Sequence, residues 1–78
     1  MLEAWVVIQV GQWSIFLRAM AGTRQVWADP DISGIEPAEA TYNADAVHNA
    51  LRKSLIAFGD AYPERSDEVK DVLRRYSL

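Results

Sequence analysis

Residues 4–20 read AWVVIQVGQWSIFLRAM, two apolar stretches on either side of the pair Gly11-Gln12. Both stretches are rich in Val, Ile, Trp and Phe, the residue types that favour β-strands. A Gly-X pair between two such stretches suits a two-residue type II′ turn, because glycine tolerates the positive φ that the first turn position needs. The sequence therefore predicts a β-hairpin with strands at 4–10 and 13–20.

The turn also determines which residues face each other across this hairpin. Side chains alternate between the two sides of a strand, so one side of the ribbon becomes wholly apolar and needs cover from another element. The predicted facing pairs on that side are Val10 with Trp13, Ile8 with Ile15, Val6 with Leu17, and Ala4 with Ala19.

A third strand is predicted at 23–28, after a two-residue turn at Ala21-Gly22. In this register Val26 joins the apolar side, whereas Trp27 joins an aromatic-rich cluster on the other side. The members of that cluster are Trp5, Val7, Phe16 and Trp27. A cluster of this size is larger than a monomer usually leaves exposed, so we expect a second helix, a second copy of the chain or a binding partner to cover it.

Helical periodicity dominates the second half of the chain. Apolar and small residues recur at i, i+3, i+4, i+7, i+8 and i+11, which predicts a helix at 44–58 with Asn43 as its N-cap and Gly59 as a left-handed C-cap. The same spacing predicts a second helix that begins near Pro63 or Ser66 and runs to the end. The stripe residues are Val47, Ala50, Leu51, Ser54, Leu55 and Phe58 in the first helix, and Val69, Val72, Leu73 and Tyr76 in the second.

The segment between the strands and the helices is predicted to be a long connection. Residues 29–43 contain two prolines and a glycine among small and acidic neighbours, with room for a short edge strand near 40–42. The predicted fold is α+β, a single compact domain at 1–78. It consists of a three-stranded antiparallel β-meander followed by two α-helices (βββαα), with the first helix packed on one face of the sheet.

The composition of the 78-residue chain excludes several kinds of site. Cys is absent, so neither a disulfide nor a thiolate metal site can form, and the single histidine, His48, excludes paired-histidine sites. His48 falls on the polar face of its predicted helix, no Gly-rich phosphate loop is present, and so short a domain has little room for a substrate pocket. We therefore expect a protein that is no enzyme, with no catalytic residues, no metal and no cofactor.

Two small-module alternatives remain open. Residues 29–35 begin as an EF-hand loop does, but Ala40 stands where that loop needs a bidentate glutamate, and local backbone hydrogen bonds are the better explanation of the aspartates. The bases of the helices alternate with acids, and the net charge is −3, so direct nucleic-acid binding is not expected. A calcium- or nucleic-acid-binding module is retained as an alternative function.

The start of the chain favours a cytoplasmic protein. An acid, Glu3, stands where a secretory signal carries bases, and Gln9 interrupts the apolar run. No stretch approaches the roughly 18 apolar residues that a membrane span requires, so no contact with a membrane is expected.

Negative charge is concentrated in residues 29–45, which hold five acids and no base, whereas 1–28 (two bases, one acid) and 46–78 (six bases, five acids) each sum to +1. An acidic segment beside aromatic side chains suits a basic protein surface, because long-range attraction speeds encounter and an aromatic anchor adds affinity. The predicted partner-binding residues are Asp29, Asp31, Glu36 and Glu39, with Trp27 or Tyr42 as the anchor.

One stretch resembles a known family. Residues 30–34 read PDISG at the end of a predicted strand, Thr41 follows seven residues after the glycine, and an Ala-rich helix comes next. Over residues 30–50 this resembles the Pro-Asp-Leu-Pro-Gly to Thr stretch of HicB-type antitoxins. The resemblance implies a small α+β domain that inhibits a toxin ribonuclease by direct binding and often oligomerises.

These features favour a small non-enzymatic inhibitor that docks on the basic surface of a larger protein. That partner would itself act on nucleic acids, as the targets of antitoxins, bacteriocin immunity proteins and phage anti-CRISPR proteins do. The main alternative is a self-associating structural or assembly subunit, in which an open sheet edge or the aromatic face pairs with a second copy to form a homodimer.

Overall fold

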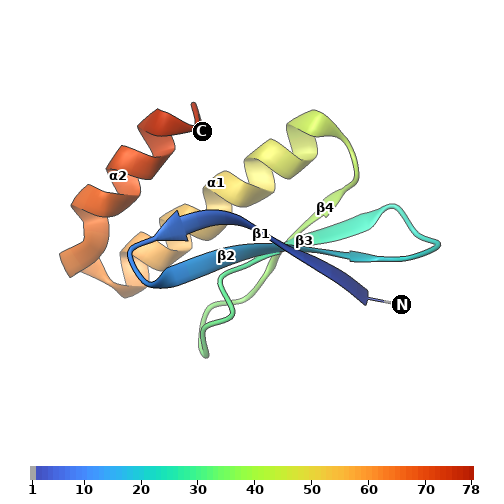
Figure 1. The fold of residues 1–78 in the computed structure, drawn as a ribbon, viewed down its shortest axis with the longest axis horizontal. Helices are drawn as coiled ribbons and strands as arrows, with labels where there is room; N and C mark the ends of the chain where they lie inside the picture. Colours follow the sequence, from blue (N-terminus) through green and yellow to red (C-terminus); the bar gives the residue numbers. More distant parts are fainter. Residues whose placement is uncertain (1) are drawn as a thin grey trace.

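A computed structural model describes residues 2–78, and Figure 1 shows one layer of strands beside two helices. The strands form one antiparallel sheet in the order β1-β2-β3-β4. The α+β class is confirmed, whereas the predicted three strands are one too few. The elements are β1 (Leu2–Val10), β2 (Trp13–Met20), β3 (Gln25–Asp29), β4 (Ala38–Thr41), α1 (Ala44–Ala61), the 3₁₀ turn η1 (Pro63–Arg65) and α2 (Ser66–Arg75).

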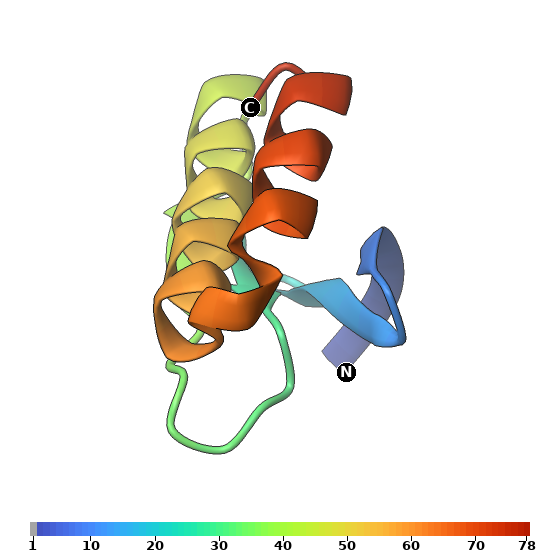
Figure 2. The same cartoon turned by 90° about the vertical axis from the view of Figure 1, so that its left-hand side faces the viewer.

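Both helices lie on the same face of the sheet, as Figure 2 shows. α1 contacts β2, β3 and β4, and α2 packs against α1 and reaches β1. The Tyr62 backbone N–H donates to the Phe58 carbonyl at 2.9 Å, and η1 follows at once, so α2 folds back beside α1. The second helix was one of three elements expected to cover the opposite side of the sheet, and it does not cover it. We call that uncovered side the open face.

β4 lies where the sequence predicted a connection with a short edge strand near 40–42. Its residues pair with β3, Ala38 opposite Ala28 and Ala40 opposite Val26, on the side that α1 covers. Alanine is a poor strand former, which is why local preference underestimates this strand. In the folded protein the small side chains let α1 lie close to the sheet.

A β-bulge at Val7 changes the predicted register of the hairpin. Ile8 faces Ile15 as predicted, but the register then shifts, and Val6 faces Phe16. Trp5 now faces Leu17, so the predicted facing pairs Val6 with Leu17 and Ala4 with Ala19 are wrong. A one-residue shift exchanges the two sides of a strand. Trp5 therefore points to the helix side, and the predicted aromatic cluster is divided.

The connection between β2 and β3 has four residues, 21–24, instead of the predicted two, and β3 begins at Gln25 rather than at residue 23. The Thr23 hydroxyl donates to the Met20 carbonyl at 2.9 Å and accepts from the Gln25 backbone N–H at 3.2 Å. This side chain stabilises the longer turn. Val26 is nevertheless on the helix side and Trp27 on the open face, as predicted.

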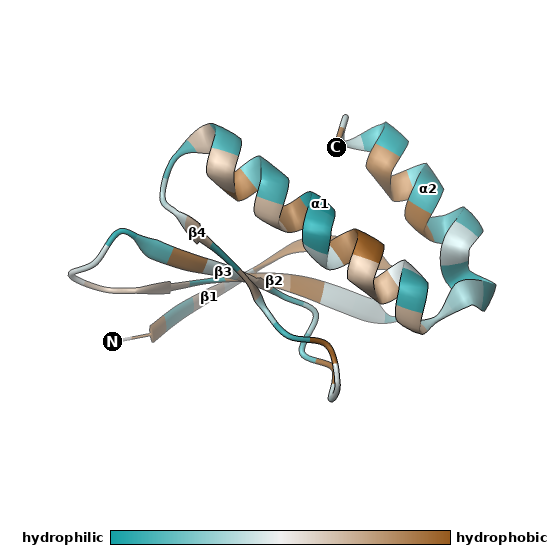
Figure 3. Cartoon of the chain, turned by 180° about the vertical axis from the view of Figure 1, so that it is seen from behind, coloured by the Kyte–Doolittle hydropathy of each residue, from teal (hydrophilic) through white to brown (hydrophobic). Residues whose placement is uncertain are grey.

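The core lies between the sheet and the two helices. The Asn43 side chain accepts from the Ala46 backbone N–H at 2.9 Å, so the predicted N-cap of α1 is confirmed. Figure 3 shows hydrophilic and hydrophobic bands alternating along α1, as the predicted stripe requires. The buried residues that form the core cluster are Ile8, Val10, Ile15, Leu55, Phe58, Val69 and Val72.

Gly59 does not end the first helix. α1 continues to Ala61, three residues beyond the predicted end. A Cβ at position 59 would lie 3.5 Å from both methyl groups of Val69, so the glycine is at the crossing of α1 and α2. No helix within residues 2–78 is long and apolar enough to cross a membrane.

Candidate functional site

On the open face, apolar and charged side chains meet without cover from a helix. Its apolar members are Leu2, Val6 and Met20, which are 52%, 56% and 38% exposed, and the half-buried Phe16 and Trp27. Its charged members are Arg18, Asp29 and Glu39. Trp27, Arg18, Asp29, Leu2 and Pro37 together line a hollow of about 300 Å³ on this face.

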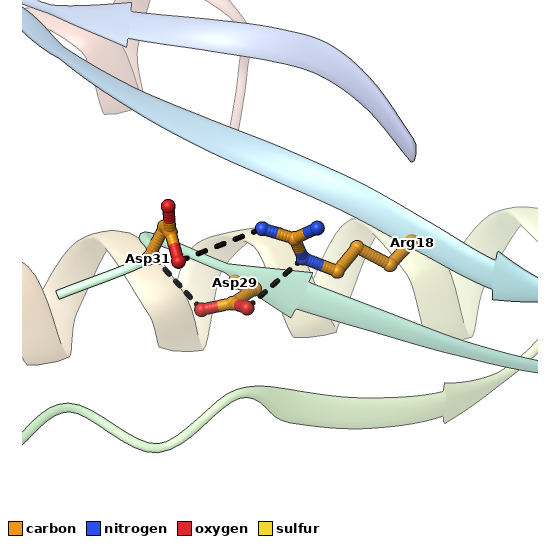
Figure 4. A network of polar contacts seen from close by, with 3 residues as sticks. All are labelled: Arg18, Asp29 and Asp31. Atoms are coloured by element: carbon orange, nitrogen blue, oxygen red, sulfur yellow. Dashed lines mark hydrogen bonds and ion pairs between the residues drawn. The ribbon is translucent and has the colours of Figure 1, made fainter. Parts of the chain in front are cut away.

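On the open face, Arg18 lies close to both Asp29 and Asp31 (Figure 4). Its Nε donates to the Asp29 carboxylate at 3.0 Å, and one Nη lies 3.6 Å from a carboxylate oxygen of Asp31. The guanidinium also stacks over the Phe16 ring, 4.9 Å from its centroid. The Arg18 and Asp29 side chains are only 24% and 16% exposed, so this pair is better shielded from water than an ordinary surface ion pair.

The segment after β3 is shaped by Asp29. Its second carboxylate oxygen accepts from the Asp31 backbone N–H at 2.8 Å, which turns the chain and holds Asp31 at a φ of +57°. This hydrogen bond between a side chain and the nearby backbone is of the kind that was predicted from the sequence for Asp29. Both carboxylates therefore lie within 4 Å of the Arg18 guanidinium. Residues 2–78 group no three His, Cys, Asp or Glu side chains as a metal site.

Trp27 and Glu39 form a second polar contact on the open face. The indole Nε1–H donates to the Glu39 carboxylate at 3.1 Å across β3 and β4. The tryptophan ring is therefore held in one orientation on the sheet surface. Such a fixed, half-exposed aromatic ring loses little conformational freedom when it is covered, which is a property of interface anchors.

The structure brings together four of the six predicted partner-binding residues. Asp29 and Asp31 meet at Arg18, and Trp27 and Glu39 bond to one another on the neighbouring strands. Glu36 is exposed in the β3–β4 connection. Tyr42, 66% exposed, lines a hollow with Leu17 and Val47 on the helix side of the sheet, so it does not share a face with Trp27.

The sequence analysis missed Arg18, Leu2, Val6 and Met20 as parts of this site. Arg18 is the only base among residues 1–23 and stands inside an apolar strand. A lone charge at such a position requires a partner, so the sequence alone could have marked Arg18 as a candidate. Leu2 and Val6 join the open face only because of the bulge, which no local pattern in β1 indicates.

Two other hollows of the described surface contain titratable side chains. His48 lies in a hollow of about 490 Å³ with a single acid, Asp45, and its Nε2 is 2.9 Å from the Ser77 carbonyl oxygen. A hollow between the β1–β2 turn and α2 contains Asp71 and Arg75. Hydrogen bonds from Arg74 and Arg75 lower the pKa of Asp71 below its ordinary value, so this carboxyl is ionised at neutral pH.

A scan of protein-family models and searches of curated proteins and of solved structures found no match to the chain. Its function is therefore argued from the geometry of the open face.

Proposed function

We propose that the chain is a non-enzymatic inhibitor that binds a larger protein through the open face and the acidic segment beside it. The observation that carries this proposal is the sheet face itself, which no helix of the described chain covers and which combines exposed apolar side chains with an aromatic ring held in place. Apolar patches rimmed by polar groups are typical of protein interfaces.

Charge favours a basic partner. Asp29 and Asp31 pair with the Arg18 guanidinium, and Glu36 and Glu39 add two further carboxylates. These five side chains together carry a charge of 1 − 4 = −3. Attraction over about 8 to 10 Å at physiological salt would raise the association rate with a positively charged surface. Glu36 and Glu39 are the exposed members, whereas Asp29 acts chiefly by holding Arg18 and the following turn.

The class of partner follows from this charge. Proteins that act on nucleic acids present basic surfaces to phosphates, and an acidic domain can occupy such a surface in place of the nucleic acid. The resemblance of residues 30–50 to HicB-type antitoxins, which inhibit a ribonuclease by direct binding, supports the same class. The inhibitor would act stoichiometrically, from a cytoplasmic location, and would need no cofactor.

The test begins with the full chain, tagged at its C-terminus, as bait in a lysate of its native host. The captured protein is purified and titrated with the chain. We expect its activity on nucleic acid to fall to zero at one equivalent, and its affinity to weaken as salt increases.

Variants separate the open face from the rest of the surface. Met20→Asp and Glu36→Lys should each weaken binding at least tenfold, the second mainly through the association rate. Ile56→Asp changes an exposed apolar side chain on the outer side of α1, 46% exposed, and should bind as the unmodified chain does. Equal binding by all three variants would exclude the open face as the docking surface.

A further inference from the structure

The free edge of the sheet at β1 has little of the usual protection over residues 2–6, where Glu3 is the one charged side chain. β1 contacts only β2 and α2 among the described elements, and its N-terminal end projects away from both helices (Figure 2). Edge strands are commonly blunted by Lys, Pro or a bulge. Residues 2–6 contain no Lys and no Pro, and the bulge comes after them, at Val7.

We propose that residues 2–6 of β1 pair antiparallel with residues 2–6 of a second copy of this chain, with the two-fold axis at Ala4. The two four-stranded sheets would then join into one continuous sheet. This inference does not rest on the proposed function, because the pairing uses the backbone edge of β1, although Leu2 and Val6 also belong to the open face.

The sequence of this strand is self-complementary about Ala4. Leu2 of one copy would face Val6 of the other on the open face, and Glu3 would face Trp5 on the helix side. Leu2, Trp5 and Val6 are all about half exposed in the single chain and would gain cover. Apolar cross-strand pairs stabilise an antiparallel ladder.

The neighbouring registers are less favourable. An axis at Glu3 would place two carboxylates opposite each other, which destabilises a sheet pair. An axis at Trp5 would bring Glu3 opposite Val7, where the bulge interrupts regular pairing. For pairing with a second copy, charge and strand regularity therefore both favour the Ala4 register.

The small area of this contact limits the affinity of the dimer. Five residues on each side bury less than the roughly 1,200 Å² at which stable specific interfaces begin. We therefore expect a weak dimer that dissociates on dilution, with a dissociation constant on the order of 100 μM. The two open faces would lie on the same side of the joined sheet.

Single cysteines test the register directly, because the chain itself contains none. Residues that face each other across an antiparallel pair have Cα atoms about 4.5 to 5.5 Å apart, which is within disulfide range. Ala4→Cys, tagged at the C-terminus and oxidised mildly at 200 μM, should therefore form a covalent dimer. Leu2→Cys or Val6→Cys alone should not, since each would lie about 13 Å from its own copy along the strand, but a mixture of the two should cross-link.

The control is Ile56→Cys, an exposed position on α1. Sedimentation equilibrium of the unmodified chain from 10 μM to 1 mM provides a second readout, and we expect the mean mass to rise toward that of a dimer. Ala4→Asp, which would set two carboxylates face to face, should weaken association at least tenfold. A chain that stays monomeric at 1 mM, or Ala4→Cys that cross-links no faster than the Ile56→Cys control, would overturn the proposal.

Discussion

At the scale of single residues, the open face depends on Arg18. Its guanidinium binds Asp29 at 3.0 Å and stacks over Phe16, and neither member of the ion pair is more than one-quarter exposed. When one partner of a shielded pair is removed, the remaining charge is left desolvated and unpaired. Arg18 therefore supports both the end of β3 and the turn that follows it.

Arg18→Met keeps the apolar stem and removes the charge. We expect this change to lower the free energy of unfolding by about 2 kcal/mol, because Asp29 loses its counterion in a half-buried position. Urea denaturation followed by tryptophan fluorescence measures the effect. Arg74→Met is the matched control: that arginine binds Asp71 with its own side chain 80% exposed, and exposed pairs contribute at most about 1 kcal/mol. Equal losses in the two variants would contradict the role of Arg18.

At the scale of elements, α1 is longer than its local signals indicate. A glycine near the end of an apolar stripe is typical of a C-cap, yet Gly59 is helical and lies against Val69 of α2. The tertiary contact between the helices thus decides where α1 ends. The same contact directs α2 to the helix side of the sheet, which leaves the open face free.

Gly59→Ala tests whether Gly59 is a helical residue packed against Val69 rather than a C-cap. The added methyl group would be in ordinary contact with Val69 at 3.5 Å, and alanine is the better helix former by about 1 kcal/mol, so we expect thermal denaturation at a higher temperature than in the unmodified chain. Gly22→Ala should have the opposite effect, because its φ of +84° strains any L side chain. A loss of stability in Gly59→Ala would show that the α1–α2 crossing has no room for the methyl group.

At the scale of the whole molecule, the sheet and both helices share one core. The molecule measures 39 × 26 × 16 Å, and the core cluster takes members from β1, β2, α1 and α2. Because this cluster joins two strands to both helices, we expect one cooperative transition in which secondary and tertiary structure are lost together.

Leu55→Ala and Ile56→Ala compare neighbouring positions on α1. Leu55 is fully buried, so its truncation should lower the free energy of unfolding by about 2 to 5 kcal/mol. Ile56 is 46% exposed and should change it by less than about 1 kcal/mol. Far- and near-ultraviolet circular dichroism should report the same midpoint in each variant. Two separate midpoints would mean that the helices and the sheet unfold independently.

Parts of the candidate site could be predicted because they depend on strand alternation. Trp27 was placed correctly on the face opposite to the core, and Asp29 and Glu39 proved to be its close neighbours on the same face. Tyr42 was assigned to the same site without a register to place it, and it lies on the helix side. Arg18 was missed as their partner since it is 11 residues from Asp29 along the chain.

Local sequence was enough to predict the hairpin turn at Gly11, the start of α1 at Asn43 and the inward stripe of that helix. Each of these depends on residues within one or two turns of chain, whose backbone preferences and periodicity act locally. Local sequence did not predict the bulge at Val7, the pairing of β4 or the side on which α2 packs. These depend on groups far apart in the chain, whose contacts outweigh local preference once they are packed together.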